Sequence, residues 1–196
     1  MRYSESHKAE TRDRILKSAS SRFREEGIDG ASLPDVMKDA GLTVGGFYRH
    51  FESKEDLFAA AMDQSLKDTL AIFGSGDDSL EGSDWAQAVA RVYLSMGHRA
   101  NQSGGCPMPA LAGDIARADE SLRTRTQSNL AILAEAVAER LDGKDASDAW
   151  AFLATLVGGL ALSRMVEDDD LARSILHACR DAASEIGNAD TEKAGS

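Results

Sequence analysis

Apolar residues recur at three- and four-residue spacing almost throughout this chain of 196 residues. This period is that of amphipathic helices, and no convincing run shows the alternation that marks a β-strand. Proline, which interrupts helices, occurs only at Pro34, Pro107 and Pro109. The pattern predicts an all-α fold of about nine helices.

The first part of the chain predicts three short helices and a longer fourth one. The first covers about residues 10–26 and ends at Gly27. Ser32 caps the second, Thr43 caps the third, which covers VGGFYRHF, and Ser53 opens the fourth. The residues expected to face the core are Ile15, Leu16, Ala19, Phe23, Val36, Met37, Ala40, Leu57, Phe58, Ala61, Met62, Leu66, Leu70 and Phe73.

The rest of the chain predicts five further helices behind a Gly- and Ser-rich loop over 74–83. A fifth helix precedes the breaker NQSGGCPMP, a short sixth follows Pro109, a seventh stops at Gly143, and an eighth is capped by Ser147 and runs to about Val166. The tail from Gly187 is expected to fray. The apolar stripe of the fifth helix is Trp85, Val89, Val92, Tyr93 and Met96, and that of the ninth is Leu171, Ile175, Cys179, Ala182 and Ile186.

Residues 33–50 meet the requirements of a helix-turn-helix, in which the second helix lies in the major groove of DNA and the first braces it. Gly41 can adopt the left-handed conformation that ends the brace helix, and Leu42 plugs the turn into the core. Gly45 and Gly46 then weaken the reading helix, each by about 1 kcal/mol relative to alanine. Such a doublet fits a backbone that approaches another molecule closely.

The charge distribution restricts where a polyanion would bind. The net charge of −11 disfavours nucleic acid, because phosphate binding depends on Lys and Arg. Residues 1–24, however, hold seven basic and three acidic side chains, whereas residues 61–196 hold 12 basic and 22 acidic. The N-terminal end is therefore the only plausible face for DNA.

The segment AGLTVGGFYRHFESKEDL, preceded by TRDRILKSASSRFREEGIDGASLPDVMKD, resembles the DNA-binding domain of the TetR family of regulators. The resemblance implies a homeodomain-like three-helix DNA-binding head over 1–58. It also implies a helical ligand-binding and dimerisation domain over 59–196, with a homodimer formed through the last two helices. The implied function is that of a repressor that binds double-stranded operator DNA as a dimer and is released by a small-molecule inducer.

In that family the reading helix contacts bases and phosphates. Alternatives remain, because Tyr48 would also fit a core aromatic, His50 would pack against the fourth helix, and Lys8 and Arg12 would solvate the first helix. Val44 departs from the basic residue that is frequent at its position. The predicted DNA-binding residues are Lys8, Arg12, Ser32, Thr43, Val44, Gly45, Gly46, Tyr48, Arg49, His50 and Lys54.

Cys106, in GGCPMPAL, is the most specific candidate for a functional residue in the second half of the chain. At the entrance of the sixth helix, backbone N–H groups and the helix dipole would stabilise its thiolate. This setting is similar to a TetR subgroup that includes the repressor of N-ethylmaleimide reductase and is associated with sensing of electrophiles or oxidants. The alternative is a small buried side chain, which is also expected for Cys179.

An apolar ligand cavity between helices is the usual small-molecule site in such a fold. His98 and Arg99 either meet an anionic ligand or face solvent. Gly158 and Gly159 would let a helix of a second copy approach the eighth helix. The predicted ligand or sensing residues, with Phe152 as a further candidate, are Cys106, Trp85, Tyr93, Met96, Met108 and Trp150.

Two other classes of protein compete with a regulator. An enzyme is disfavoured, since the sequence has no nucleophile elbow, phosphate-cradling loop, metal-ligand spacing or paired catalytic carboxylates, and no cofactor is predicted. A helical ligand- or protein-binding module without DNA binding remains the alternative, because Val44, Glu52 and the net acidity favour it. No apolar run approaches the roughly 18 residues of a membrane span and residues 1–10 lack a secretory signal, which predicts a cytoplasmic protein without membrane contact.

Overall fold

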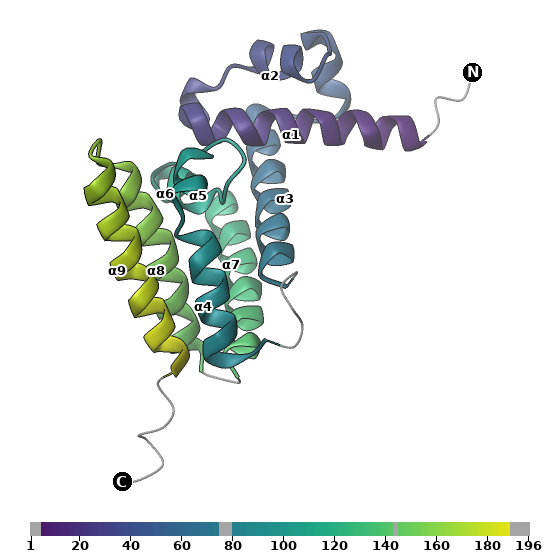
Figure 1. Ribbon diagram of the computed structural model, residues 1–196. Coiled ribbons are helices and arrows are strands. Elements are labelled where there is room, and N and C mark those ends of the chain that lie inside the picture. Colours follow the sequence, from purple (N-terminus) through teal and green to yellow (C-terminus); the bar gives the residue numbers. More distant parts are fainter. Residues whose placement is uncertain (1–4, 75–79, 143–144, 189–196) are drawn as a thin grey trace. The chain divides into compact units, whose positions relative to one another are not determined.

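The computed structural model describes residues 5–74, 80–142 and 145–188. Within these ranges it holds α-helices and one 3₁₀ helix and no strand, which confirms the all-α prediction. Most of the loop over 74–83, the predicted stop at Gly143 and the tail beyond residue 188 lie outside the described residues. In chain order the helices are α1 Glu5–Gly30, α2 Leu33–Asp39, the 3₁₀ helix η1 Val44–Arg49, α3 Lys54–Gly74, α4 Gly82–Tyr93, α5 Met96–Ala100, α6 Met108–Arg117, α7 Glu120–Arg140, α8 Ala146–Arg164 and α9 Asp169–Asn188 (Figure 1).

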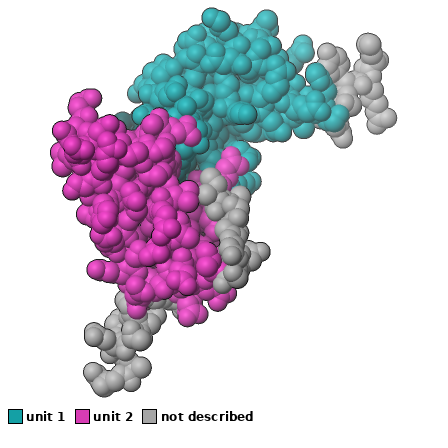
Figure 2. All heavy atoms as spheres, viewed as in Figure 1, with its two compact units in different colours: residues 1–67, 102–127 teal, residues 68–101, 128–196 magenta. Residues whose placement is uncertain are grey.

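The chain forms two compact units (Figure 2). Unit 1 comprises residues 1–67 and 102–127, and unit 2 comprises residues 68–101 and 128–196. The boundary falls inside α3 and again inside α7, so unit 1 contains α6 as well as the helix-turn-helix. This division by packing differs from the predicted division by function at residue 58, which followed the extent of the resemblance to the TetR family and stays a prediction.

Unit 1 is built around one cluster of buried apolar side chains. Phe23 of α1 meets Phe58 of α3 edge to face, with ring centroids 5.0 Å apart. Phe47 of η1 stacks on Phe51 at 5.9 Å. Leu111 of α6 belongs to the same cluster, and α6 packs against α1. The helix-turn-helix and α6 therefore share one core.

The inward faces predicted for the first four helices are confirmed, since every member is buried except Leu70, which is half-buried. Ser32 caps α2 by accepting a hydrogen bond from the Asp35 N–H at 3.2 Å. The predicted end of the first helix at Gly27 is confirmed, since Gly27 adopts the non-helical φ of 74° and a kink there separates the helix from a last segment that reaches Gly30. Thr43 occupies the predicted N-cap position of η1, but its side chain makes no capping hydrogen bond.

In unit 2, α9 packs along both α4 and α8. A Cβ at Gly159 of α8 would lie 2.7 Å from the Cys179 sulfur, which shows how closely α9 approaches there. A Cβ at the neighbouring Gly158 would meet nothing within 4 Å. Gly159 therefore serves packing inside the subunit, which corrects its predicted use against a second copy.

Three predictions for the second half need correction. Val92 of the predicted α4 stripe is 68% exposed. Asp145, not Ser147, caps α8, because its carboxylate accepts from the Ser147 and Asp148 N–H groups. The buried residues of α9 each follow a predicted position by one residue, so the buried side of this helix is rotated from the predicted stripe. Leu171, the first residue of that stripe, is 50% exposed. The residues of α9 that α4 and α8 bury are Ala172, Leu176, Ala183 and Gly187.

Among the described helices, α8 is long and apolar enough to cross a membrane by length and composition, with a mean hydropathy of 1.3 over its most apolar window. The test averages over a window, so α8 passes it without an unbroken apolar run. A core helix of a soluble protein passes the same test, and α8 packs against α9. The finding is weak evidence for a membrane span.

Candidate functional site

The reading helix η1 is anchored by one ring and otherwise faces outward. Phe47 is fully buried, whereas Tyr48 is 72% exposed and Val44 42% exposed. Thr43, Gly45 and Arg49 are exposed as well. The interpretation of Tyr48 as a core aromatic is therefore wrong, since its ring meets Phe47 edge to face from the outside.

The glycine doublet of η1 has no packing reason inside unit 1. A Cβ at Gly45 would meet nothing within 4 Å, and a Cβ at Gly46 would only touch the Met37 methyl at 3.9 Å. Neither residue has a positive φ. Alanine would fit at both positions and would stabilise the helix. The doublet is thus consistent with close approach by a molecule outside the subunit.

A group of basic side chains lies near the end of η1. The Arg12 guanidinium of α1 sits 4.5 Å above the Phe51 ring. Burial lowers the pKa of His50, and the positive charges of Lys8, Arg12 and Arg49 lower it further. The structure thus brings together four of the predicted DNA-binding residues in a positive environment that favours an anion.

Ser32 and Lys54, also predicted to bind DNA, are engaged within unit 1. The Ser32 hydroxyl caps α2 and also donates to the Asp35 carboxylate at 2.5 Å. The Lys54 ammonium donates to the Asp29 carbonyl at 3.3 Å. These contacts give both side chains a structural role, whereas the exposed residues of η1 have none.

The sequence analysis missed a row of polar side chains on α1, at Arg14, Ser18 and Arg22, that binds α2. The Ser18 hydroxyl donates to the Val36 carbonyl at 2.8 Å. The Arg22 guanidinium donates to the Asp39 carboxylate at 2.7 Å and thereby lowers the pKa of that carboxyl. Arg14 donates to the carbonyl of Ala40, which directly follows α2 as its C-cap residue. Their spacing of four residues on one helix face was the available signal.

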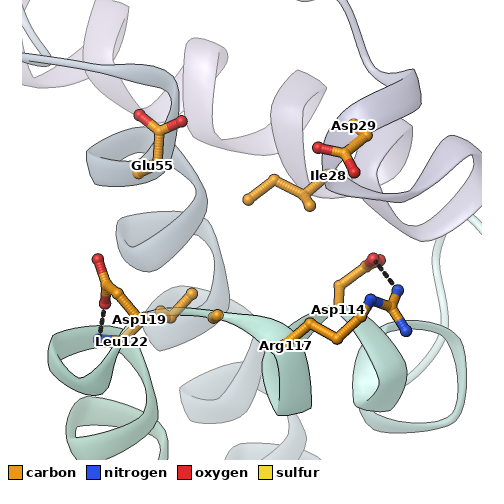
Figure 3. Close-up of a pocket in the computed structure, with 8 residues that line it drawn as sticks. Ile28, Asp29, Glu55, Asp114, Arg117, Asp119 and Leu122 are labelled. Atoms are coloured by element: carbon orange, nitrogen blue, oxygen red, sulfur yellow. Dashed lines mark hydrogen bonds and ion pairs between the residues drawn. The ribbon is translucent and has the colours of Figure 1, made fainter.

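A small pocket of about 170 Å³ lies inside unit 1 where α1, α3, α6 and α7 meet (Figure 3). Its Asp114 pairs with Arg117 at 3.0 Å, and Asp119 accepts from the Leu122 N–H at 2.8 Å (Figure 3). The remaining carboxylates give the pocket an excess of negative charge, which disfavours an anionic ligand. The described residues contain no group of three metal-ligating side chains suited to a metal ion. The lining residues are Ile28, Asp29, Glu55, Asp114, Arg117, Ala118, Asp119 and Leu122.

The six predicted ligand or sensing residues do not all fall in one unit. Cys106 and Met108 belong to unit 1, and the other four belong to unit 2. Cys106 is 6% exposed and directly precedes Pro107, the N-cap of α6, so its predicted position at the helix entrance is confirmed. Trp150 is 43% exposed on α8.

Trp85, Tyr93 and Phe152 lie in the core of unit 2. The Trp85 indole donates to the Phe73 carbonyl at 3.2 Å, and its ring lies 5.5 Å from that of Phe152. The Tyr93 ring lies 6.1 Å from that of Phe73. The structure therefore gives these side chains a packing role, and ligand binding by them stays a prediction.

His98 and Arg99 belong to an internal network of unit 2. The Arg99 guanidinium donates to the Ser163 carbonyl at 2.8 Å and to the Val166 carbonyl at 2.7 Å, both at the end of α8. Arg164 donates in return to the His98 carbonyl at 2.8 Å. The two residues thus tie α5 to the turn between α8 and α9, a role that neither sequence-based alternative included.

Comparison with known proteins agrees with this architecture. Residues 15–61 match the model of the bacterial regulatory proteins of the tetR family. The transcriptional regulator UidR of Escherichia coli K12 is 33% identical over 90 residues, which cover 46% of this chain and 44% of UidR. A TetR transcriptional regulator from Chloroflexus aurantiacus is 26% identical in its crystal structure, with a TM-score of 0.74 over 90% of this chain and 93% of that one. Residues 15–61 thus form a DNA-binding domain of the tetR family, and the fold of the chain is that of a TetR transcriptional regulator.

Its helix-turn-helix is accordingly a DNA-binding domain. The reduced form of Escherichia coli NemR has the same fold, with a TM-score of 0.75 and 17% identity over 91% of this chain and 95% of NemR. At that identity the likeness concerns the fold alone. The match to UidR spans less than half of that protein.

The internal network predicts a stability loss in mild acid that depends on His98. Burial lowers the pKa of His98, so its imidazole is protonated less readily than in the unfolded chain. The hydrogen bond from Nδ1 to the Tyr93 carbonyl, at 2.8 Å, raises the pKa and only partly opposes the effect of burial. The unfolded chain therefore takes up a proton at this histidine before the folded chain does, and the free energy of unfolding falls as the pH drops below about 6.5. Urea unfolding between pH 7.5 and 5.5 should show a smaller loss for His98→Asn, which keeps the donor to Tyr93 but does not titrate.

His7→Asn, at an exposed position of α1, provides the matched control and should retain the wild-type pH dependence. Identical pH profiles for the wild type and His98→Asn would contradict a contribution from His98.

Proposed function

We propose that this TetR-family protein is a ligand- or electrophile-responsive repressor that binds double-stranded operator DNA as a homodimer in the cytoplasm. The outward face of η1 carries the proposal, because Val44, Gly45 and Tyr48 are exposed and neither glycine of the doublet has a packing reason inside unit 1. Exposed tyrosine hydroxyls are common phosphate donors, and phosphate contacts set the register in which a helix reads base edges. Thr43, Val44 and Gly45 are the residues that we assign to the bases.

Phosphate attraction would come from the basic group formed by Lys8, Arg12 and Arg49 around His50. Because the whole chain carries a net charge of −11, this local excess has to provide most of the electrostatic affinity. Val44 contributes an apolar surface that suits a thymine methyl group rather than a phosphate.

Arg49→Met should weaken operator binding and reduce its salt dependence. One lost phosphate contact lowers the slope of log K against log salt by about 1. The probe is a duplex selected from a random-sequence pool by the wild-type protein, and anisotropy at several salt concentrations gives the slope.

Arg91→Met removes the same charge from an exposed position of α4 and should leave the slope unchanged. Failure of the wild type to bind any duplex in a salt-dependent manner would instead favour the helical module without DNA binding.

The surface of α8 and α9 supports dimerisation with a second copy. Leu162 of α8 is 53% exposed, Met165 directly after α8 is 76% exposed, and Leu171 of α9 is 50% exposed. Trp150 also lies on α8, and a Cβ at Gly158 of the same helix would meet nothing within 4 Å. Exposed apolar side chains that gather on one surface often mark contacts between proteins. A two-fold pair would also present two reading helices to two half-sites.

The double variant Leu162→Glu/Met165→Glu should be monomeric at micromolar concentration, because a dimer would bury four unpaired carboxylates at its interface. Sedimentation velocity measures the mass. Val92→Glu places a single carboxylate on an exposed apolar position of α4 and should stay dimeric. A wild type that sediments as a monomer would contradict the interface.

Cys106 supports a route by which an electrophile relieves repression. The loop before it is tied to α1, since Arg24 donates to the Ser103 carbonyl at 2.6 Å and Gln102 donates to the Arg24 carbonyl at 2.6 Å. A group attached to the buried thiol has no room without movement of this loop or of α6. Because α6 shares the core of unit 1, such a movement would disturb the DNA-binding head.

Alkylation with iodoacetamide should therefore release the wild-type protein from its selected duplex but not Cys106→Ser. Mass spectrometry follows the modification and anisotropy follows the binding. Cys179→Ser is the control for the second thiol, whose pKa burial raises, and should be released like the wild type. Complete modification of Cys106 without loss of DNA binding would move the search to a noncovalent inducer.

A further inference from the structure

The turn between α2 and η1 is the point from which the reading helix takes its direction. Helix η1 is six residues long, has 3₁₀ geometry and contains two glycines, so its own hydrogen bonds stabilise it poorly. Its orientation depends on the core contact of Phe47 at one end and on this turn at the other.

The backbone of the turn follows a helix-terminating motif. Gly41 adopts φ 69°, its N–H donates to the Lys38 carbonyl at 2.9 Å, and the Leu42 N–H donates to the Met37 carbonyl at 2.8 Å. These bonds engage carbonyls within α2. The carbonyl of Ala40 is at the turn itself, and it accepts a hydrogen bond from the guanidinium of Arg14.

We propose that Arg14 is a positioning residue for DNA reading: its guanidinium holds the Ala40–Thr43 turn and so sets the direction of η1. Ser18 and Arg22, the other members of the row on α1, bind Val36 and Asp39 within or at the end of the brace. Arg14 is the member that reaches past the brace. The inference rests on the proposed reading of DNA by η1.

Gly41 lacks a side chain at the position where the Arg14 guanidinium packs against the turn. A Cβ at Gly41 would lie 2.7 Å from an Arg14 terminal nitrogen, and the positive φ of Gly41 already disfavours any other residue. The guanidinium thus lies directly against the left-handed residue of the turn. Hydrogen bonds from a charged donor are stronger than neutral ones, which suits a contact that has to hold an exposed turn.

Positioning and direct phosphate binding make different predictions. A lost phosphate contact weakens binding to all sequences alike and lowers the salt slope by about 1. A misdirected η1 weakens binding to the selected operator but leaves binding to unrelated duplex unchanged. The ratio of specific to nonspecific affinity therefore separates the two roles. Lower stability alone would not change this ratio, because both affinities are measured on folded protein.

The experiment compares Arg14→Met with Lys17→Met, which removes the same charge from an exposed position on the same helix. The probes are the duplex selected by the wild type and a shuffled duplex of equal length. We expect Arg14→Met to lower the specific-to-nonspecific ratio about tenfold, Lys17→Met to leave it within about twofold, and Arg14→Lys to recover part of the loss because it keeps one charged donor. Circular dichroism and thermal unfolding verify that each variant is folded at the assay temperature.

Gly41→Ala tests the same contact from the other side if Arg14→Met does not fold. It should also lower the ratio, since the added Cβ displaces the guanidinium. An unchanged ratio in folded Arg14→Met, or an equal loss on both duplexes with a reduced salt slope, would overturn the positioning role. A wild type that does not discriminate between the two duplexes would instead contradict the proposed function itself.

Discussion

Burial of Phe47 is the interaction on which the DNA-binding surface depends. Helix η1 has too few residues and too many glycines to hold its shape alone, so the ring that it inserts into the core of unit 1 fixes it. Phe51 stacks on that ring, and Phe23 and Phe58 continue the cluster into α1 and α3. Replacing a fully buried phenylalanine by alanine costs about 3–5 kcal/mol in typical cores. The exposed face of η1 needs no packing partners inside the subunit because Phe47 anchors the helix in the core.

The same core also contains α6, which has consequences for regulation. Leu111 is buried in the cluster, and Met108 packs against it from the first turn of α6. Close-packed interiors respond to displaced side chains by shifting elements rather than by absorbing the change. A change at the entrance of α6, where Cys106 lies, therefore acts on the core that supports η1.

Local chemistry made the head largely predictable from the sequence. The inward residues of α1 and α2, the Ser32 cap and the left-handed Gly41 follow from helix period and capping rules, and each is present. What the sequence concealed depends on partners distant in the chain. The stripe on α9 containing Leu171 is apolar, but helix period alone does not reveal which apolar side α4 and α8 cover. Arg14 was missed for the same reason, because its acceptor, the Ala40 carbonyl, lies 26 residues away.

The acidity of the chain bears on how this regulator can distinguish its operator. Nonspecific affinity for DNA comes almost entirely from phosphate contacts, and a net charge of −11 with one local basic group keeps that contribution small. Specific binding must then come from base contacts and from the accuracy with which they are placed. A weakly structured reading helix would forfeit that accuracy. Anchoring of η1 by Phe47 in the core, and at the turn by the role that we propose for Arg14, is therefore most needed in a protein whose charge contributes little.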